Sequence, residues 1–380
     1  MDRSDPTARD ERFMAEAIEL ARRAAGRTHP NPLVGCVITR GDLVVGRGWH
    51  RQAGCDHGEV DAIKDADADL QGCELFVNHE PCCHFGRTPP CTNAIVEAGI
   101  RRVVVGTIDP DPRVSGKGLD ILRDAGVEVV CGVLEEESRK LNAPFFTYIN
   151  KGRPLVAAKW AMSLDGKIAT HNGDSAWITG EAARRHVHHL RDIHDAILVG
   201  ANTLHRDDPR LTCRLDEGRD PVRFVLDERL EAPATHRIFQ PDLSTAPTVV
   251  LTGPAVDEER KKRLLDQGVE VVSLELDERG WLSTQAILSA VYDRQLMSVL
   301  VEGGGALLGS LFDAQAVDYA YAYIAPRLIG GSTAPTPLQG RGVEAVARGL
   351  LIAEPTIEQF PPDLLIHGEV APRPAATTPA

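Results

Sequence analysis

The sequence has 380 residues, of which 43% are apolar, and its formal net charge is −13 at pH 7. One hydrophobic core rarely grows to this size, so two domains are expected. The acidic excess is similar in the two halves, so no basic half or tail indicates a nucleic-acid surface. An anionic substrate would therefore have to be held by a few local arginines and backbone amides.

The sequence predicts neither a signal peptide nor a membrane span. Its start, MDRSDPTARDERF, is charged, and no apolar stretch reaches the length of about 18 residues that a bilayer needs. Without a secretion signal, the eight cysteines favour reduced thiols in a cytoplasmic enzyme over a disulfide framework. Seven of them lie at or before Cys131, so any thiol chemistry is expected in the N-terminal half.

The first half predicts a helix at residues 9–25 and then a β-hairpin whose strands begin at Leu33 and Leu43. Helices and strands alternate after the hairpin: a helix from His57, a strand at 74–78, a helix at 91–98, a strand at 101–106, a helix at 119–124, a strand at 127–133 and a helix from Glu135. This order indicates a mixed, mostly parallel sheet covered by helices.

The pattern restarts near Asn150, where we place the domain boundary within about five residues. The segment GRPLVAAKWAMSLDG opens with a strand. The elements predicted after it are a helix at 180–192, strands at 195–200, 222–227 and 248–251, a helix at 255–266, a strand at 269–274, a helix at 284–292, a strand from Ser298, a helix to Asp313, and strands at 320–325 and 364–368. The last ten residues, 371–380, have nothing to bury and are predicted to be a disordered tail.

Two short motifs in the first half suggest a zinc-dependent deaminase. His57 and Glu59 are two residues apart, and the segment HEPCCHFGRTPPC supplies three thiols. A zinc deaminase needs one histidine and two cysteines on the metal, a water in the fourth position, and a carboxylate that does not bind the metal. Neighbouring Cys82 and Cys83 generally point apart. We therefore expect His57, Cys82 and Cys91 as the ligands and Glu59 as the general acid and base.

The spacing departs from the usual deaminase signature, which has two residues between its cysteines where this chain has eight. The inserted residues carry His84 and Arg87. A structural zinc site is one alternative; it would leave Glu59 without a function and would need a fourth protein ligand, such as Cys83, His79 or His84. Buried, inert cysteines without a metal are the other alternative.

Together with THPNPLVGCVI and GRGWH, these motifs closely resemble the deaminase domain of the RibD family of bifunctional riboflavin-biosynthesis enzymes. The family commonly has serine in place of Cys83 and alanine in place of Gly58, and both differences leave the expected ligands intact. The resemblance implies an α/β fold of the three-layer, cytidine deaminase-like type, with substrate contacts from Asn31, His50, His84 and Arg87. By itself, His50 would more often be a hydrogen-bonded structural histidine.

The second half has no such cluster, and its most distinctive segment is SVLVEGGGALLGSLFD. A strand that runs through glycines into a helix exposes backbone amides at the helix N-terminus, where a phosphate can bind. The segment is neither a Walker motif nor the usual dinucleotide fingerprint. Considered alone, it is equally compatible with a turn that serves only packing.

Several further motifs occur in order and resemble the reductase domain of the same family, which has a dihydrofolate reductase-like fold: KWAMSLDGKIA, GDSAWIT, the LRD before DAILVG, and TLHRDDPRLTCR. The resemblance covers residues 10 to 370. It implies that NADPH is contacted by Ala161, Trp177, Thr203, Asp207, Gly304, Gly305, Ala306, Leu307, Leu308, Gly309 and Ser310. It implies that the reductase substrate is contacted by Ser175, Arg191, Leu211, Arg214 and Glu302.

Two of the arginines, Arg191 and Arg214, could clamp a phosphate bidentately. Lys159 and Asp207 are candidates for polar or proton-transfer roles at the sugar. Lys159 could instead be an ordinary lysine of a strand end, and Asp207 could belong to a turn or cap a helix. Trp177 could be a core residue. The neighbouring run of Arg184, Arg185, His186, His188 and His189 is predicted to be a solvated helix face.

The resemblance thus implies a zinc-dependent deaminase at residues 1–150 and an NADPH-dependent reductase at residues 151–370. The first domain would deaminate 2,5-diamino-6-(5-phosphoribosylamino)pyrimidin-4(3H)-one, and the second would reduce the ribosyl group of the product to ribityl. The resemblance also implies small phosphorylated pyrimidines as substrates and a homo-oligomer, a dimer or larger, with no nucleic acid or membrane as a partner. Two other classes of protein remain as alternatives. A nucleic-acid deaminase would need a basic surface that binds the strand. A non-catalytic scaffold with a structural zinc would leave the glycine turn without a ligand.

Overall fold

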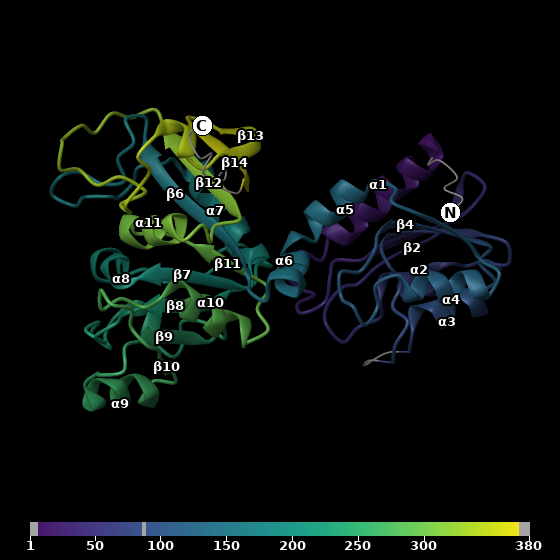
Figure 1. Cartoon of the computed structure of the whole chain (residues 1–380), viewed down its shortest axis with the longest axis horizontal. Coiled ribbons are helices and arrows are strands. Elements are labelled where there is room, and N and C mark those ends of the chain that lie inside the picture. The colour runs from purple at the N-terminus through teal and green to yellow at the C-terminus, as the bar shows by residue number, and fades with distance from the viewer. Residues whose placement is uncertain (1–6, 86–88, 372–380) are drawn as a thin grey trace, which may run out of the picture. The chain divides into compact units, whose positions relative to one another are not determined.

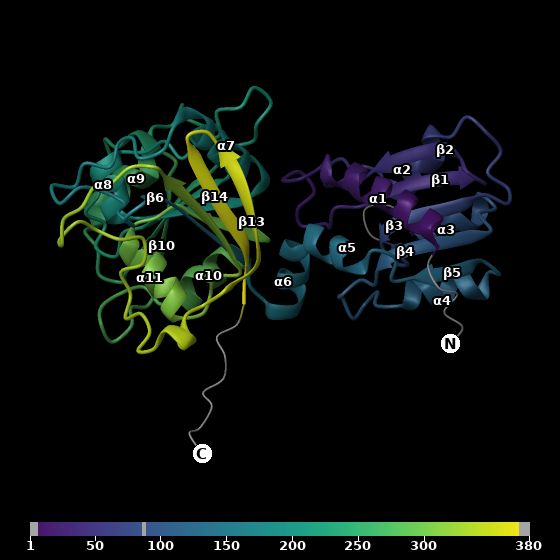
Figure 2. The same cartoon turned by 90° about the horizontal axis from the view of Figure 1, so that it is seen from above.

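The computed structural model describes residues 7–85 and 89–371. Contacts between residues divide the chain into two compact units, Met1–Arg153 and Pro154–Ala380, and each unit is built around its own sheet (Figures 1 and 2). The predicted tail at 371–380 lies outside the described residues except for Ala371.

In the described part of the first unit, five strands form one sheet in the order β2-β1-β3-β4-β5. The strands are β1 (Gly35–Arg40), β2 (Leu43–Trp49), β3 (Glu74–His79), β4 (Arg102–Thr107) and β5 (Glu128–Cys131). β1 pairs antiparallel with β2 and β3, as the predicted hairpin requires, and β3, β4 and β5 run parallel. β3 is buried along its whole length because it lies at the centre of the sheet.

Helices cover both faces of this sheet, so the unit has three layers (Figure 2). The helices are α1 (Ala8–Arg22), α2 (Gly58–Asp65), α3 (Cys91–Glu97), α4 (Lys117–Asp124), α5 (Glu135–Leu141) and α6 (Ala143–Lys151). On one face, α1 packs Phe13 against Phe76 of β3, with the ring centroids 5.1 Å apart. On the other face, Ile95 of α3 and Leu122 of α4 share a core with Leu75. Alternate side chains of β3 therefore pack against helices on opposite faces of the sheet, because successive side chains of a strand point to opposite sides.

The described strands of the second unit form one nine-stranded sheet in the order β10-β9-β8-β7-β11-β6-β12-β14-β13. Their bounds are β6 (Leu155–Ser163), β7 (Ala196–Gly200), β8 (Val222–Leu226), β9 (Thr248–Thr252), β10 (Glu270–Ser273), β11 (Ser298–Val301), β12 (Tyr319–Ala325), β13 (Ile352–Phe360) and β14 (Asp363–Val370). The strands from β10 to β12 run parallel, and β14 and β13 are antiparallel. The carboxyl ends of the parallel strands therefore lie along one edge, where α/β sheets bind ligands.

The helices of the second unit are α7 (Glu181–Ile193), α8 (Ala201–Asp207), α9 (Glu258–Asp266), α10 (Thr284–Tyr292) and α11 (Gly305–Asp313). Leu198 of β7 packs with α10 and α11 in one core cluster, whereas Ile197 and Val199 pack with α8 and α9 in another. The fold of both units is thus α/β, as predicted. Among the residues that the structure describes, no helix is long and apolar enough to cross a bilayer.

Two α-helices, α6 and α8, and one strand, β13, are absent from the predictions, as are the short 3-10 helices at Arg237–Phe239 and Val346–Arg348. β13 is the edge strand, and most of its side chains are exposed, so it lacks the apolar alternation that identifies a half-buried strand. Pro355 lies where its register with β14 shifts, between Ala353 and Thr356. Proline is tolerated at such a bulge on an edge, although it argues against a strand when the sequence is considered alone.

Candidate active sites

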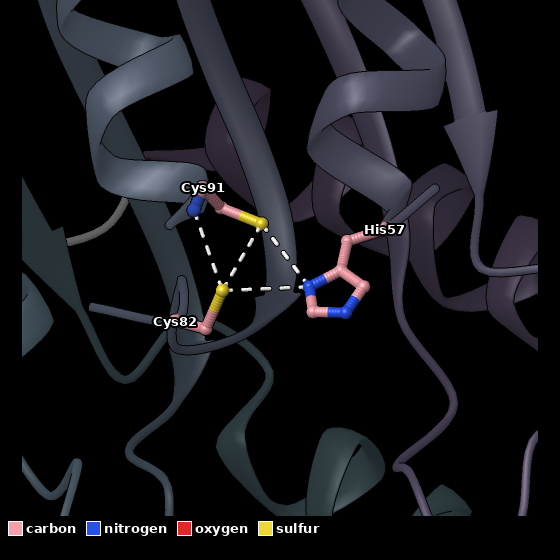
Figure 3. Close-up of side chains that lie close together, drawn as sticks. All are labelled: His57, Cys82 and Cys91. Atoms are coloured by element: carbon pink, nitrogen blue, oxygen red, sulfur yellow. Dashed lines mark hydrogen bonds between the residues drawn. The ribbon is translucent and has the colours of Figure 1, made fainter. Parts of the chain in front are cut away.

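In the first unit the structure gathers His57, Cys82 and Cys91 (Figure 3). His57 is the N-cap residue of α2, Cys91 is the first residue of α3, and Cys82 lies in the segment between β3 and α3. The Nδ1 atom of His57 is 3.2 Å from Sγ of Cys91 and 3.4 Å from Sγ of Cys82. The two sulfur atoms are 3.4 Å apart. Two helix starts and one loop therefore place three donor atoms in a small triangle.

This triangle fits a zinc ion. Bonds of about 2.0 Å to nitrogen and about 2.3 Å to sulfur in a tetrahedron put neighbouring donors about 3.5 Å apart. The hydrogen bonds from Cys91 and His57 lower the pKa of the Cys82 thiol, which favours the thiolate that binds metals. Among the described residues, neither Cys83, His79 nor His84 joins the group. A structural site with a fourth protein ligand therefore has no support.

Glu59 lies in the first turn of α2, beside the triangle, and its side chain is 2% exposed. Burial raises the pKa of Glu59 to about 7, and the Cys82 thiolate adds to this effect. Its Oε2 atom has no hydrogen-bond partner among the described residues. A buried carboxylate oxygen without a partner is costly unless a ligand or water completes it. The carboxylate thus has the position that a deaminase needs for proton transfer.

The expected substrate residues of this unit lie in different settings. Nδ2 of Asn31 donates to Nε2 of His50 at 3.1 Å, and Nδ1–H of His50 donates to the carbonyl of Asp56 at 2.9 Å. The rings of His50 and His57 are 5.2 Å apart, so this pair borders the triangle. His84 is exposed, and Arg87 lies outside the described residues.

In the second unit, a cavity of about 1550 Å³ brings together nearly all of the expected reductase residues. Small-molecule pockets usually measure roughly 300–1,000 Å³, so this cavity has room for a dinucleotide and a second ligand. The predicted residues that line it are Lys159, Ala161, Ser175, Trp177, Arg191, Thr203, Asp207, Leu211, Arg214, Glu302, Gly304, Gly305, Ala306, Leu307, Leu308 and Ser310. Gly309 does not line it; this glycine packs against Gln339 and Gly340, where a side chain would not fit.

Glu302 is the centre of a buried ion-pair network in this cavity. It accepts two hydrogen bonds from Arg191, at 2.6 and 2.9 Å, and Nζ of Lys159 is 3.7 Å away. Burial alone would raise the pKa of Glu302, but the charges of Arg191 and Lys159 outweigh it and lower the pKa to about 2. Arg191 also donates to the carbonyl of Thr212 at 3.0 Å. Its guanidinium is therefore already engaged, and Arg214, which has no ion pair among the described residues, is the better candidate for holding a phosphate.

The glycine turn after β11 fits a dinucleotide cofactor. Gly303 has φ +107°, a conformation that other residues rarely adopt, and Gly305 has no room for a side chain because the carbonyl of Thr336 lies too close. The N–H of Gly304 donates to Oγ1 of Thr203 at 3.1 Å, which ties the turn to α8. The residues that follow, at the start of α11, line the cavity, and the free backbone amides of a helix start can bind a pyrophosphate.

Two interpretations from the sequence are wrong here. Trp177 is not a core residue: it is 67% exposed, lines the cavity, and has the guanidinium of Arg184 4.7 Å from its ring. The histidine run is not a solvated face throughout, because His188 is buried and His186 is half-buried. Nδ1 of His186 lies 2.7 Å from the hydroxyl of Tyr323, and the His186 ring stacks on Phe360.

His188 and Tyr323 are among the cavity residues that the sequence did not assign to this site. Burial and the charge of Arg191 lower the pKa of His188 to about 4, so it is neutral near pH 7. Tyr323 lies 5.9 Å from Nζ of Lys159, measured to its ring centroid. The only signal for Tyr323 was the alternation of alanine and aromatic residues in AYAYIA, which predicts a strand but no function.

Comparisons with known proteins cover both units. Residues 7–107 match the family model of the cytidine and deoxycytidylate deaminase zinc-binding region, and residues 154–366 match the RibD C-terminal domain. The chain is 41% identical to the riboflavin biosynthesis protein RibD of Aquifex aeolicus, over 94% of this chain and 97% of that protein. The chain belongs to the RibD family.

Other RibD proteins extend this relationship. The chain is 42% identical to RibD of Bacillus amyloliquefaciens, over 93% of this chain and 95% of that protein. It aligns with a crystal structure of a diaminohydroxyphosphoribosylaminopyrimidine deaminase/5-amino-6-(5-phosphoribosylamino)uracil reductase from Thermotoga maritima with a TM-score of 0.84 and 38% identity, covering 96% and 99% of the two chains. RibD of Acinetobacter baumannii aligns with a TM-score of 0.85 and 35% identity, with the same coverage.

The predicted family, fold and activities are confirmed by these comparisons. As a member of the RibD family, the chain is a bifunctional deaminase and reductase of riboflavin biosynthesis, with a zinc-binding deaminase domain and an NADPH-dependent reductase domain. Its substrates are small phosphorylated pyrimidines.

Substitution of Cys91 and of Cys83 should show which of the two cysteines is a zinc ligand. Cys91→Ser is expected to lose nearly all bound zinc after dialysis, because a hydroxyl replaces a thiolate in the triangle. Cys83→Ser is expected to keep the zinc content of the wild type. Metal analysis per chain measures both, and equal losses in the two variants would contradict this ligand set.

The charge of Glu302 predicts an acid dependence of the reductase unit. The pKa of Glu302 in the folded unit is about 2, below its usual value of 4.5. The ionised carboxylate therefore stabilises the folded unit fully above pH 4.5, and this stabilisation is lost as the pH falls from 4.5 toward 2. We expect the stability difference between wild type and Glu302→Gln to shrink by about 3 kcal/mol across this window. Chemical denaturation at a series of pH values measures it, and a constant difference would argue against the ionised carboxylate.

Proposed function

We propose that the first unit converts 2,5-diamino-6-(5-phosphoribosylamino)pyrimidin-4(3H)-one to the corresponding uracil derivative and ammonia. The second unit then reduces the ribosyl group of this product to ribityl with NADPH. The name of the similar Thermotoga maritima enzyme describes these two activities for that protein. The observation that carries the proposal is the buried Glu59 carboxylate beside His57, Cys82 and Cys91.

In the deaminase site, His57, Cys82 and Cys91 would hold zinc. When bound, zinc supplies a water that loses a proton near neutral pH. Oε2 of Glu59 accepts a proton from the water and delivers it to the ring nitrogen beside the amino-bearing carbon. The same carboxylate then takes the proton of the newly added hydroxyl group and gives it to the departing amine, so ammonia leaves and a C=O bond replaces the C–N bond. Asn31 and His50, which border the site, orient the pyrimidine.

In the reductase site, the amides at the start of α11 bind the cofactor pyrophosphate, and Trp177, Thr203 and Asp207 complete its pocket. NADPH, when bound, supplies the hydride. Lys159 and Glu302 form a fixed polar pair where the sugar is expected, and Ser175, Leu211 and Arg214 enclose the rest of the substrate, with Arg214 on its phosphate. Hydride transfer depends on close positioning more than on a strong base, which suits this rigid network.

The two functional domains span residues 1–150 and 151–370 in this proposal. The enzyme works in the cytoplasm, where its eight cysteines, which are all free, stay reduced. It acts as a homo-oligomer, a dimer or larger, on small molecules and not on nucleic acid. The acidic balance of the chain supports the last point.

The order of the two reactions tests the assignment of substrates. The purified full chain, given the diaminopyrimidine and NADPH, is expected to release ammonia and oxidise NADPH in equal amounts. The separately prepared deaminated product is expected to oxidise NADPH without ammonia release. NADPH oxidation that precedes ammonia release, or that occurs only with the diaminopyrimidine, would reverse the proposed order.

A further inference from the structure

The cavity of the reductase unit extends beyond the residues assigned so far. Gly280, Trp281 and Leu282, from the segment between β10 and α10, also line it. A second cavity, of about 450 Å³, shares Trp281, Leu282 and Ser310 with the first. Trp281 therefore lies where the two cavities meet, next to the last residue of the expected cofactor turn.

The segment that carries Trp281 is a hydrogen-bonded turn. Oδ1 of Asp277 accepts the backbone N–H groups of Arg279 and Trp281 at 2.9 and 3.0 Å. The N–H of Asp277 donates to the carbonyl of Trp281 at 2.7 Å, and Leu276 and Leu282 form a bridge on either side. The indole is nevertheless 49% exposed. The backbone thus holds a large apolar ring at the cavity wall without burying it.

The position of this turn follows from the order of the strands. The carboxyl ends of β6, β11, β7 and β8 follow one another along the cavity. Lys159 is on β6, and Arg229 follows β8, three strands away, which is about 14 Å at the usual strand spacing of ~4.8 Å. The turn that carries Trp281 lies near the carboxyl end of β8. Leu276, which precedes this turn, and Glu228, which follows β8, both lie next to Gly253.

The glycine turn lies between these two ends, since β11 is between β6 and β7. From there α11 leads away, and Ser310 lies five residues after Gly305, or about 7.5 Å along the helix axis. An extended dinucleotide keeps its two bases apart on either side of the pyrophosphate. A cofactor with its nicotinamide near Lys159 and its pyrophosphate at the glycine turn would extend its adenosine half toward Ser310 and Trp281, which line both cavities.

We propose that Trp281 stacks on the adenine ring of NADPH and closes the adenosine end of the reductase site. Stacking needs a flat aromatic face that is exposed before the ligand binds, and the half-exposed indole on its fixed turn provides one. Leu282 and Ser310 form the neighbouring walls of the same pocket. The proposal rests on NADPH being the cofactor of the second unit.

Tryptophan fluorescence and calorimetry with half-cofactors test the proposal on the zinc-loaded full chain. 2′,5′-ADP carries the adenine half and nicotinamide mononucleotide the other half. In the wild type, 2′,5′-ADP is expected to quench tryptophan fluorescence more strongly than nicotinamide mononucleotide does. In Trp281→Phe this extra quenching is expected to disappear while 2′,5′-ADP still binds. In Trp281→Ala the Kd for 2′,5′-ADP is expected to rise roughly tenfold, the usual effect of losing one base-stacking ring.

The matched control is Trp49→Phe, because Trp49 lies in the deaminase unit on β2. This variant is expected to keep the quenching and the Kd of the wild type. Quenching by 2′,5′-ADP that persists in Trp281→Phe, or an unchanged Kd in Trp281→Ala, overturns the role of Trp281. Absence of NADPH binding by the wild type would instead overturn the cofactor assignment on which the inference rests.

Discussion

Replacement of Glu59 by glutamine is expected to lower the rate of ammonia release by roughly 10²- to 10⁴-fold, the usual contribution of a positioned general acid and base. Glutamine keeps the shape of the side chain but cannot accept and return a proton. Zinc content should stay at the wild-type level, since Glu59 is not one of the three gathered ligands. Ammonia release from the diaminopyrimidine and metal content per chain are the two measurements.

A second variant on the same helix shows whether a loss of activity comes from lost proton transfer or from misfolding. Asp65 lies at the exposed end of α2, where its carboxylate accepts the N–H of Arg47, so Asp65→Asn is expected to keep near-normal ammonia release. NADPH oxidation with the deaminated product should be unchanged in both variants. If Glu59→Gln deaminates at the wild-type rate, the carboxylate is not the proton carrier. If it loses its zinc, the site depends on Glu59 for metal binding.

Replacement of Glu302 by glutamine is expected to destabilise the reductase unit by about 3–5 kcal/mol, because it leaves buried positive charge without compensation. Arg191 loses a bidentate ion pair, and the partly buried Lys159 loses its carboxylate neighbour. Calorimetry measures the effect. NADP⁺ should raise the unfolding transition of the reductase unit, which identifies it, and the other transition should stay in place. NADPH oxidation should fall sharply, because Glu302 also lines the cavity.

Glu358→Gln provides the comparison for this variant. The Glu358 carboxylate pairs with His367 in the same sheet, but its side chain is 43% exposed, so its loss should cost less than about 1 kcal/mol. A similar cost for the two substitutions would contradict the special role of burial at Glu302. A stable Glu302→Gln variant with normal NADPH oxidation would remove Glu302 from both the stability argument and the site.

The parts of the fold that could be predicted are those whose sequence pattern is local. The hairpin of β1 and β2 and the alternation that follows each depend on neighbouring residues, so their periodicity predicts them. β13 could not be predicted, since an edge strand with exposed side chains on both faces has no apolar period. The inward positions of His186 and His188 depend on contacts with Tyr323 and on the cavity, which the sequence of α7 does not contain.

The same difference applies to the sites. His57, Cys82 and Cys91 belong to two short motifs, and the deaminase chemistry requires a fixed set of residue types, so their grouping without Cys83 could be predicted. The bond between Arg191 and Glu302 joins residues 111 positions apart, and nothing in the sequence predicts that this arginine holds a carboxylate. The sequence likewise gives no indication of a role for Trp281, because its place beside Ser310 follows from the order of the strands.

Zinc removal and restoration, with both reactions followed in one preparation, tests the central claim most directly. Chelation is expected to abolish ammonia release, zinc should restore it at one ion per chain, and NADPH oxidation with the deaminated product should continue throughout. Ammonia release that survives complete removal of zinc would contradict the metal site formed by His57, Cys82 and Cys91. Joint loss of both reactions would contradict two separate active sites.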